Sequence, residues 1–85
     1  MPYQLKFSSK AKKDLKKLPK REAIGIKSKI DYYLNTSDPL VYAKPIRELP
    51  PATHRFRVNK WRIKFFIESY IIYVTRVQRR DKAYK

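Results

Sequence analysis

The sequence lacks cysteine altogether and holds only one glycine and one histidine. Without cysteine, the chain can form no disulfide framework, thiolate metal site or thiol nucleophile. A single glycine cannot build a phosphate-cradling loop. His54 has no obvious acidic partner nearby, and the seven acidic residues are scattered along the chain. We therefore expect no metal site, no cofactor, no Ser-His-Asp triad and no carboxylate pair for glycoside hydrolysis.

Long apolar runs are also missing from the 85 residues. No segment has the length of a signal-peptide core or of a membrane-spanning helix. We expect a soluble protein of the cytoplasm that has no membrane partner. The length indicates one small domain, residues 1–85, with a modest core, and a hydrophobic content of 42% is enough for a packed fold.

Positive charge is what the chain has in excess. Its 22 Lys and Arg residues against 7 Asp and Glu leave a net charge of +15. Residues 1–53 contribute +7 (12 basic minus 5 acidic), and residues 54–85 contribute +8 (10 minus 2). A small domain usually tolerates such self-repulsion because its partner is polyanionic, which indicates nucleic acid or an acidic protein. A generally lysine-rich proteome is the alternative explanation.

The N-terminal part predicts one strand and two helices. Residues 2–8 alternate between apolar and polar, as in a strand with one buried face, and Ser8 or Ser9 can cap the helix that follows. That helix, residues 10–18, has a narrow apolar stripe and ends at Pro19, and a second helix covers residues 20–34. Gly25 lies inside the second helix, and close packing against the first helix is one possible reason for it.

The C-terminal part predicts three strands after a proline-rich loop at residues 39–53. Apolar and polar residues alternate over 54–59 and 61–68, while residues 70–77 are almost wholly apolar and predict a central strand buried on both sides, with Tyr70 and Tyr73 in the core. The order β-α-α-β-β-β predicts an α+β fold, a mostly antiparallel sheet with a helical hairpin packed on one face. The opposite face of the sheet would carry four basic residues: Arg55, Arg57, Arg62 and Lys64.

Arginine, lysine and tyrosine are the side chains left to perform chemistry. They suit RNA cleavage by the RNA's own 2′-hydroxyl, because arginine forks bind phosphate oxygens and stabilise charge that develops on the phosphorus. Tyrosine can stack on a base or donate a proton. Arginine is a poor general base. The sequence leaves that role open among His54, Lys60, Lys64 and Lys82, or an attack without a strong base.

Structural roles compete for several of these side chains. His54 shares the strand parity of Phe56, so a packed or edge histidine is the expected outcome. Trp61 falls on the apolar face of its strand and is expected in the core. Arg76 would serve only to solvate a sheet edge.

The chain resembles the RelE/ParE superfamily of toxins from type II toxin–antitoxin systems. The resemblance spans nearly the whole chain, which looks like a short, archaeal-type member without a long C-terminal helix. It is carried by the order of elements and by four local segments: residues 18–20 (LPK), 44–49 (KPIREL), 54–62 (HRFRVNKWR), and 77–80 (VQRR) followed by Tyr84.

The resemblance implies a set of site residues and partners. RelE-like members cleave mRNA in the ribosomal A site, and the matching catalytic positions are Arg55, Arg57, Arg62, Arg80 and Tyr84. Further RNA contacts are expected from Arg79, Lys82, Lys60 and Lys64. Strict strand alternation would favour Arg79, but the last strand is expected to end near Gln78, so alternation does not decide. The family position makes Arg80 the first choice for the key arginine, with Arg79 kept as a contact. The implied partners are the ribosome, mRNA and a small, acidic, partly disordered antitoxin.

Three functions follow from these observations. The first is a toxin that acts as a metal-independent, ribosome-dependent endoribonuclease. The second is a ParE-like inhibitor of gyrase, a class that shares the fold but generally lacks the full basic set with the C-terminal tyrosine. The third is a basic RNA-binding protein without enzymatic activity, which would bind with a steep dependence on salt.

Overall fold

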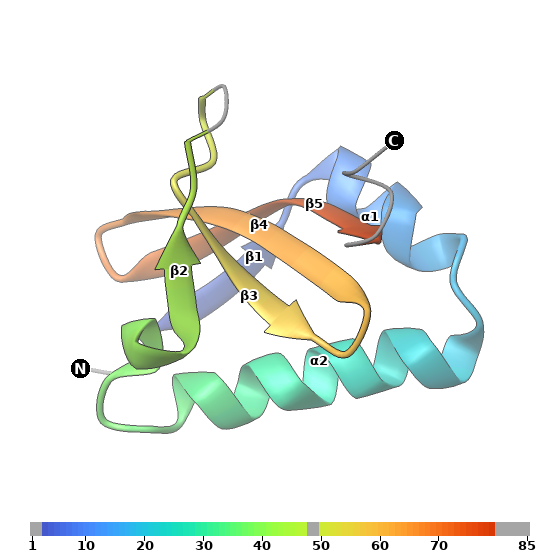
Figure 1. The fold of residues 1–85 in the computed structure, drawn as a ribbon, viewed down its shortest axis with the longest axis horizontal. Coiled ribbons are helices and arrows are strands. Elements are labelled where there is room, and N and C mark those ends of the chain that lie inside the picture. The colour runs from blue at the N-terminus through green and yellow to red at the C-terminus, as the bar shows by residue number, and fades with distance from the viewer. Residues whose placement is uncertain (1–2, 48–49, 80–85) are drawn as a thin grey trace.

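The computed structural model describes residues 3–47 and 50–79. Its elements, in chain order, are β1 (Gln4–Phe7), α1 (Ser9–Lys16), α2 (Lys20–Leu34), the short 3-10 helix η1 (Pro39–Tyr42), β2 (Ala43–Pro45), β3 (His54–Val58), β4 (Trp61–Glu68) and β5 (Ile71–Arg79). The strands form one five-stranded sheet in the order β1-β5-β4-β3-β2. Figure 1 shows α2 running along one side of this sheet, with α1 near the end of β5.

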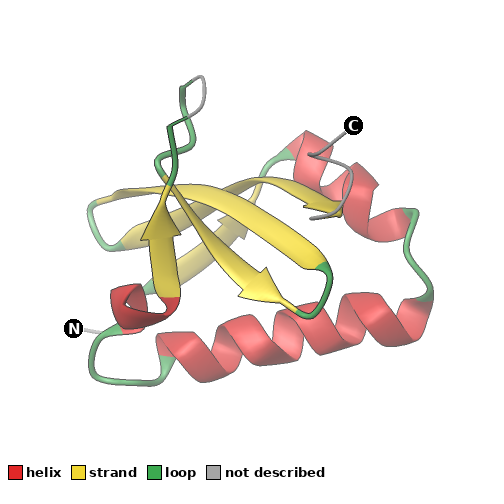
Figure 2. Cartoon of the chain, viewed as in Figure 1, coloured by secondary structure: helices red, strands yellow, loops and turns green. Residues whose placement is uncertain are grey.

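The sheet is antiparallel except at one edge. β2, β3, β4 and β5 pair antiparallel in sequence order, whereas β1 pairs parallel with β5, so that Leu5 faces Ile72 and Phe7 faces Val74. Figure 2 shows the resulting two layers, the sheet and the two helices. The predicted α+β fold, with its β-α-α-β-β-β order and helical hairpin on one face, is confirmed.

Local sequence signals explain where the two helices begin and end. The Ser8 hydroxyl accepts a hydrogen bond of 3.0 Å from the Ala11 amide, which satisfies a free donor of the first turn of α1. Pro19 separates the helices and stands directly before α2, where its missing amide hydrogen costs nothing. The explanation offered for Gly25 is wrong, because a Cβ built on it meets no atom within 4 Å.

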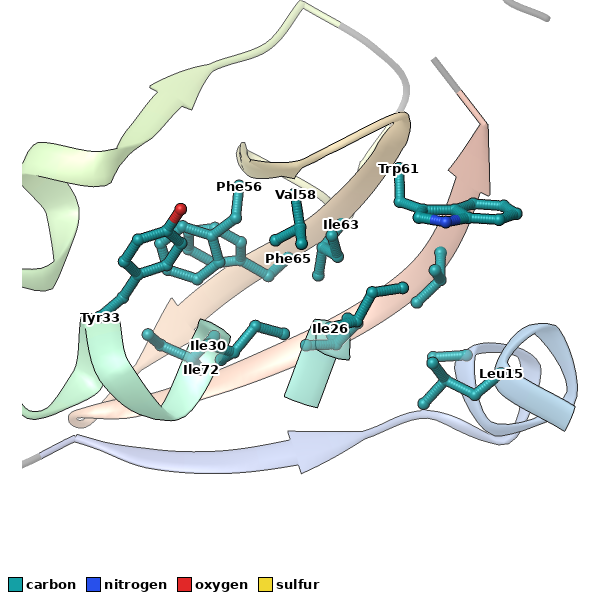
Figure 3. Close-up of a cluster of buried hydrophobic side chains, with 13 residues drawn as sticks. Leu15, Ile26, Ile30, Tyr33, Phe56, Val58, Trp61, Ile63, Phe65 and Ile72 are labelled. Carbon is teal, nitrogen blue, oxygen red and sulfur yellow. The ribbon is translucent and has the colours of Figure 1, made fainter. Parts of the chain in front are cut away.

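The core lies between the helices and the inner face of the sheet (Figure 3). Ile26 and Ile30 of α2 are almost fully buried against it. On the sheet, the rings of Phe56 and Phe65 stack at 4.6 Å between centroids, and Tyr33 covers Phe56 at 5.1 Å. Burial of these apolar side chains at helical spacing on α2 and at alternate positions on the strands is what holds the two layers together.

Three details of the connections differ from expectation. The segment 39–53 is not all loop, because Ala43–Pro45 form the edge strand β2 against β3. Tyr70 is not a core residue: it is 54% exposed and stands with Ser69 in the tight β4–β5 turn, where both residues have positive φ (63° and 52°). β5 is an interior strand, but only its inner face is buried, by Ile72, Val74 and Val77; its other face is half-exposed.

Candidate nucleic-acid interface

The outer face of the sheet, opposite the helices, carries the predicted basic residues side by side. In the β3–β4 pairing, Arg57 lies directly opposite Arg62 and Arg55 lies directly opposite Lys64. Directly opposed residues of an antiparallel pair project on the same side, with Cβ atoms about 5 Å apart. The structure thus brings Arg55, Arg57, Arg62 and Lys64 into one compact group, which we call the basic face.

Neighbouring strands extend the basic face in both directions. On β2, Lys44 pairs with Arg55, and on β5, Arg76 pairs with Lys64. A row of four basic residues therefore crosses four strands of the sheet. Gln78 of β5 pairs with Arg62 and supplies a neutral amide next to this row. A polyanion laid across the strands would meet this row of cationic side chains.

A β-bulge in β5 sets which side chains reach the outer face. Lys64 pairs with Arg76, yet the next residue, Phe65, pairs with Val74, so Thr75 is the extra residue. Its hydroxyl lies 3.3 Å from the Lys64 carbonyl oxygen and donates to it. The extra residue reverses the alternation that follows, because side chains of a strand alternate between faces. Val77 is consequently buried with Val74, and Gln78 falls on the outer face.

The carboxylate of Asp14 fastens α1 to this bulged part of β5. It accepts hydrogen bonds from Arg76 Nε at 2.8 Å, from Arg76 Nη2 at 3.2 Å and from the Val77 amide at 2.8 Å. Burial raises the pKa of Asp14, but the bonds from Arg76 and Val77, with the charges of Arg76 and Lys17, outweigh burial and hold this pKa below its usual value. The same pairing with Asp14 raises the pKa of Arg76. Arg76 is therefore an ion-paired anchor, and the prediction that it only solvates an edge is wrong.

Two cavities lie on either side of a shared boundary formed by Lys64, Arg76 and Gln78. The first, of about 540 Å³, is bounded by the last part of α1, and we call it the helix-end groove. The second, of about 480 Å³, is bounded by the start of α1, and we call it the helix-start groove. Besides the boundary, the helix-end groove is lined by Asp14, Lys17, Leu18, Trp61, Arg62, Val77 and Arg79. The helix-start groove is lined by Ser8, Ser9, Lys10, Pro50, Pro51, Ala52 and Thr75.

The remaining predicted residues occupy different places. Arg79 belongs to the end of β5, pairs with Trp61 and places its guanidinium carbon 6.0 Å from the centre of the Trp61 ring. It borders the helix-end groove but projects from the opposite side of β5 to Gln78. Lys60 lies in the β3–β4 turn, 3.9 Å from a carboxylate oxygen of Glu22. Arg80, Lys82 and Tyr84 lie outside the described residues.

His54 and Trp61 take the structural roles that strand parity predicts. The His54 ring stacks on Phe65 at 5.8 Å, and its Nδ1 lies 2.9 Å from the Thr53 hydroxyl, so it is directed away from the basic face. Trp61 is buried, and its Nε1–H donates a 2.7 Å hydrogen bond to Glu22 Oε1 at the start of α2. This bond ties the β3–β4 turn to the helix layer and leaves Trp61 as a core residue.

Two further properties concern metal ions and membranes. Within residues 3–47 and 50–79, no three His, Cys, Asp or Glu side chains gather in a way that could hold a metal ion. In the same part of the chain, no helix has the length and apolar character needed to cross a membrane.

Comparison with known proteins supplies the fold's relatives. No protein-family model and no curated protein sequence matches the chain. Solved structures do match. The toxin–antitoxin complex RelBE2 from Mycobacterium tuberculosis contains a chain that is 26% identical, with a TM-score of 0.71, over 94% of this chain and 100% of that one. This chain has the fold of the RelE toxin superfamily.

Two more distant structures share this RelE-like fold. The RelE–RelB complex from Pyrococcus horikoshii aligns with a TM-score of 0.72 at 17% identity, covering 94% of this chain and 97% of that chain. A YafQ variant from E. coli aligns with a TM-score of 0.69 at 16% identity, covering 98% and 99% of the two chains. Together with the RelBE2 match, they bear out the RelE-like resemblance inferred from the sequence over almost the full length.

Sequence reasoning missed some of the residues that shape the site. Asp14 went unnoticed, although it is the only acidic residue of a lysine-rich helix, and that contrast was a usable signal. Gln78 was noticed only as the expected end of a strand. The proline-rich segment was read as a connection, whereas Pro50, Pro51 and Ala52 form a wall of the helix-start groove. No local sequence pattern predicts this wall, because it forms only once the segment lies beside α1 and β5.

Proposed function

We propose that this protein is the toxin of a toxin–antitoxin pair and cleaves mRNA on the ribosome as an endoribonuclease. The observation that supports this most is the basic face itself: Arg57 opposite Arg62 and Arg55 opposite Lys64, on the fold of the RelE and YafQ toxins. Directly opposed like charges destabilise a sheet, so such an arrangement is best explained by a polyanionic ligand. The two grooves next to the face give an RNA strand room to follow the surface.

The proposed chemistry uses the RNA as its own nucleophile. The 2′-hydroxyl attacks the adjacent phosphorus, the bond from phosphorus to the 5′-oxygen of the next nucleotide breaks, and the products are a 2′,3′-cyclic phosphate and a 5′-hydroxyl. Arg55, Arg57 and Arg62 bind the phosphate oxygens and stabilise the negative charge that grows on them in the transition state. In this proposal Arg80 and Tyr84 complete the site, Tyr84 by stacking or by giving a proton to the leaving oxygen.

Lys64 is the proposed proton acceptor. Of the four candidates from the sequence, His54 is stacked on Phe65 on the inner side and Lys60 lies beside Glu22 in the β3–β4 turn. A third candidate, Lys82, lies outside the described residues. Lys64 projects from the middle of the basic face, in register with Arg55 on one side and Arg76 on the other. A lysine is the type of basic side chain that serves as a general base in enzymes, whereas arginine stays protonated and cannot.

The proposed partners are the ribosome with its mRNA and a cognate antitoxin. Three of the matching structures are RelB–RelE complexes, so an antitoxin that binds this chain is the simplest expectation. With a net charge of +15, the protein suits an acidic, partly disordered segment that folds on its surface. Such a segment would compete with RNA wherever it covers the basic face.

Cutting of mRNA in a translating cell-free extract tests the proposal. The purified protein should cut mRNA there and barely cut free RNA, and Arg62→Ala should lower cutting by about 100- to 1,000-fold, as for loss of one charge-stabilising group. Arg21→Ala is the matched control, because Arg21 is an exposed arginine on α2. Uniform cutting of free RNA, or full activity in the Arg62 variant, would contradict the proposal. Inhibition of gyrase at stoichiometric protein would favour the ParE-like alternative.

A pair of variants at Lys64 separates its charge from its basicity. Lys64→Arg keeps the positive charge but cannot accept a proton, so binding should persist while cutting falls about 100- to 10,000-fold. Lys64→Ala removes both the charge and the proton acceptor, so both RNA binding and cutting should fall. If Lys64→Arg cuts as fast as the unsubstituted protein, Lys64 is a phosphate contact and not the general base. Binding of a non-cleavable RNA with 2′-deoxy substitution at the cut site gives the independent measure of affinity.

A further inference from the structure

We infer that Gln78 reads the edge of an RNA base beside the cleaved bond and thereby determines which sequences are cut. This inference rests on the proposed function and deepens it, since it assigns the sequence preference of the same site to one side chain. Gln78 is opposite Arg62 on the outer face of the sheet, and Arg57 lies on the far side of Arg62, two strands away from Gln78. It also belongs to the boundary between the helix-start and helix-end grooves.

Gln78 lies where an RNA strand would pass if it followed both grooves. The two cavities, of about 540 and 480 Å³, each have the size of an ordinary ligand pocket. They share only Lys64, Arg76 and Gln78 among the residues that the structure describes. Two successive nucleotides that occupy the two grooves would therefore straddle this boundary, with the connecting phosphate near the cations and a base beside the amide.

The three boundary residues differ in whether they suit phosphate binding or base recognition. Lys64 and Arg76 are cations, which bind phosphate and carry little information about sequence. Gln78 is neutral, and its amide offers both donors and an acceptor, the combination that recognises a base edge. RNA is read in this way where its bases are unstacked and their edges are free.

The Gln78 amide is available for such a contact. Within residues 3–47 and 50–79, no hydrogen bond, ion pair or ring contact engages this side chain, although it is half-buried. The outward-facing arginine two residues earlier on β5, Arg76, is held by Asp14. The bulge at Thr75 directs Gln78 outward, so it places a neutral amide next to the cationic row.

The first experiment compares the cut-site profiles of Gln78→Leu and the unsubstituted protein across a mixed pool of mRNAs in a translating extract. Leucine has a similar size but no hydrogen-bonding group. The base preference at one position next to the cut should weaken by about 5- to 100-fold, the range for one good amide–base pair. Gln4→Leu is the matched control: Gln4 is the only other glutamine, exposed on the edge strand β1, and its variant should keep the original profile. An unchanged profile in the Gln78 variant would overturn the inference.

A binding experiment makes the inference independent of catalysis. Short single-stranded RNAs that differ at one base are titrated against the unsubstituted protein, Gln78→Leu and Gln4→Leu, with fluorescence anisotropy as the readout. The Gln78 variant should bind all four RNAs with nearly equal affinity, while the other two proteins discriminate. If the unsubstituted protein does not cut mRNA but still discriminates between the RNAs, and Gln78→Leu does not, the proposed nuclease is wrong and Gln78 is still a residue that recognises a base. Equal discrimination by all three proteins would overturn the inference even if the protein cuts mRNA.

Discussion

The two faces of the β3–β4 hairpin are built from alternate residues of the same ten or so positions, yet they differ in their effect on stability. The inner face carries Phe56, Trp61 and Ile63, which are buried against the helices. The outer face opposes cation to cation across the strands, an arrangement that lowers the stability of the hairpin. Stability therefore resides in one parity of the sequence and the proposed anion binding in the other, so we expect that the two properties can be altered separately.

The largest expected effect is on the inner face. Phe56 is fully buried, stacked on Phe65 at 4.6 Å and covered by Tyr33 at 5.1 Å, so Phe56→Ala should lower the free energy of unfolding by about 3–5 kcal/mol. Urea unfolding measures the loss. Phe66→Ala is the comparison, because Phe66 lies on the other parity of β4, only half-buried against Tyr73. Equal losses from the two substitutions would contradict the division of the sheet into a stabilising face and a binding face.

A smaller effect is expected where α1 meets β5. Asp14→Asn removes the charge that accepts from Arg76 and the Val77 amide, and should lower the free energy of unfolding at neutral pH by about 1–2 kcal/mol. Because the folded-state pKa of Asp14 lies below its unfolded value, its stabilisation is complete above that unfolded value, near 3.8, and is lost as the pH falls through the folded-state pKa.

Urea unfolding as a function of pH tests this sign. The difference in unfolding free energy between the unsubstituted protein and Asp14→Asn should be constant at neutral pH and shrink only below about pH 4. Asp31→Asn, which alters an exposed carboxylate on α2, should show a much smaller difference. A difference for Asp14→Asn that grows as the pH falls would contradict the ion-pair account.

The smallest expected effect lies on the basic face and has the opposite sign. Arg57→Thr removes the like charge opposite Arg62 and should raise the free energy of unfolding by about 0.2–1 kcal/mol at low ionic strength. The gain should fade as salt is added, because salt screens exposed charges. The same change should weaken RNA binding and reduce the slope of log K against log salt by about 0.7.

Lys6→Thr is the control for that comparison. Lys6 is an exposed cation on the edge strand β1, and its cross-strand neighbour is Tyr73 rather than another cation. Its loss should leave both the unfolding free energy and RNA binding nearly unchanged. If Arg57→Thr lowers the free energy of unfolding instead of raising it, the cost assigned to opposed like charges is wrong.

Most of the fold was predictable because its signals are local. Ser8 caps α1, Pro19 separates the helices, and α2 runs over the residues that its apolar spacing predicts. The parity of β3 and β4 placed all four residues of the basic face correctly, since alternation in a half-buried strand follows directly from the pleat. The family resemblance added the expected positions of Arg80 and Tyr84, which stay predictions.

The features that could not be predicted depend on contacts between distant parts of the chain. β2 has only three residues and includes Pro45, so it is a strand only because β3 offers it an edge. The almost wholly apolar sequence of β5 gives no sign of the bulge at Thr75. That bulge moves each later side chain to the opposite face of the sheet. The bond from Arg76 to Asp14 joins residues 62 positions apart. Each of these shapes the candidate site without any pattern in the neighbouring sequence.

The parallel pairing of β1 with β5 has a consequence for the newly made chain. Ser8, at the end of β1, donates its hydroxyl hydrogen to the Thr75 carbonyl, 67 positions later. Synthesis proceeds from the N-terminus, so β1 has no neighbour in the sheet until β5 leaves the ribosome. Both grooves are lined by β5 and are therefore absent from the growing chain. The basic face of β3 and β4 therefore precedes the two grooves during synthesis, and a chain that lacks β5 cannot form the grooves.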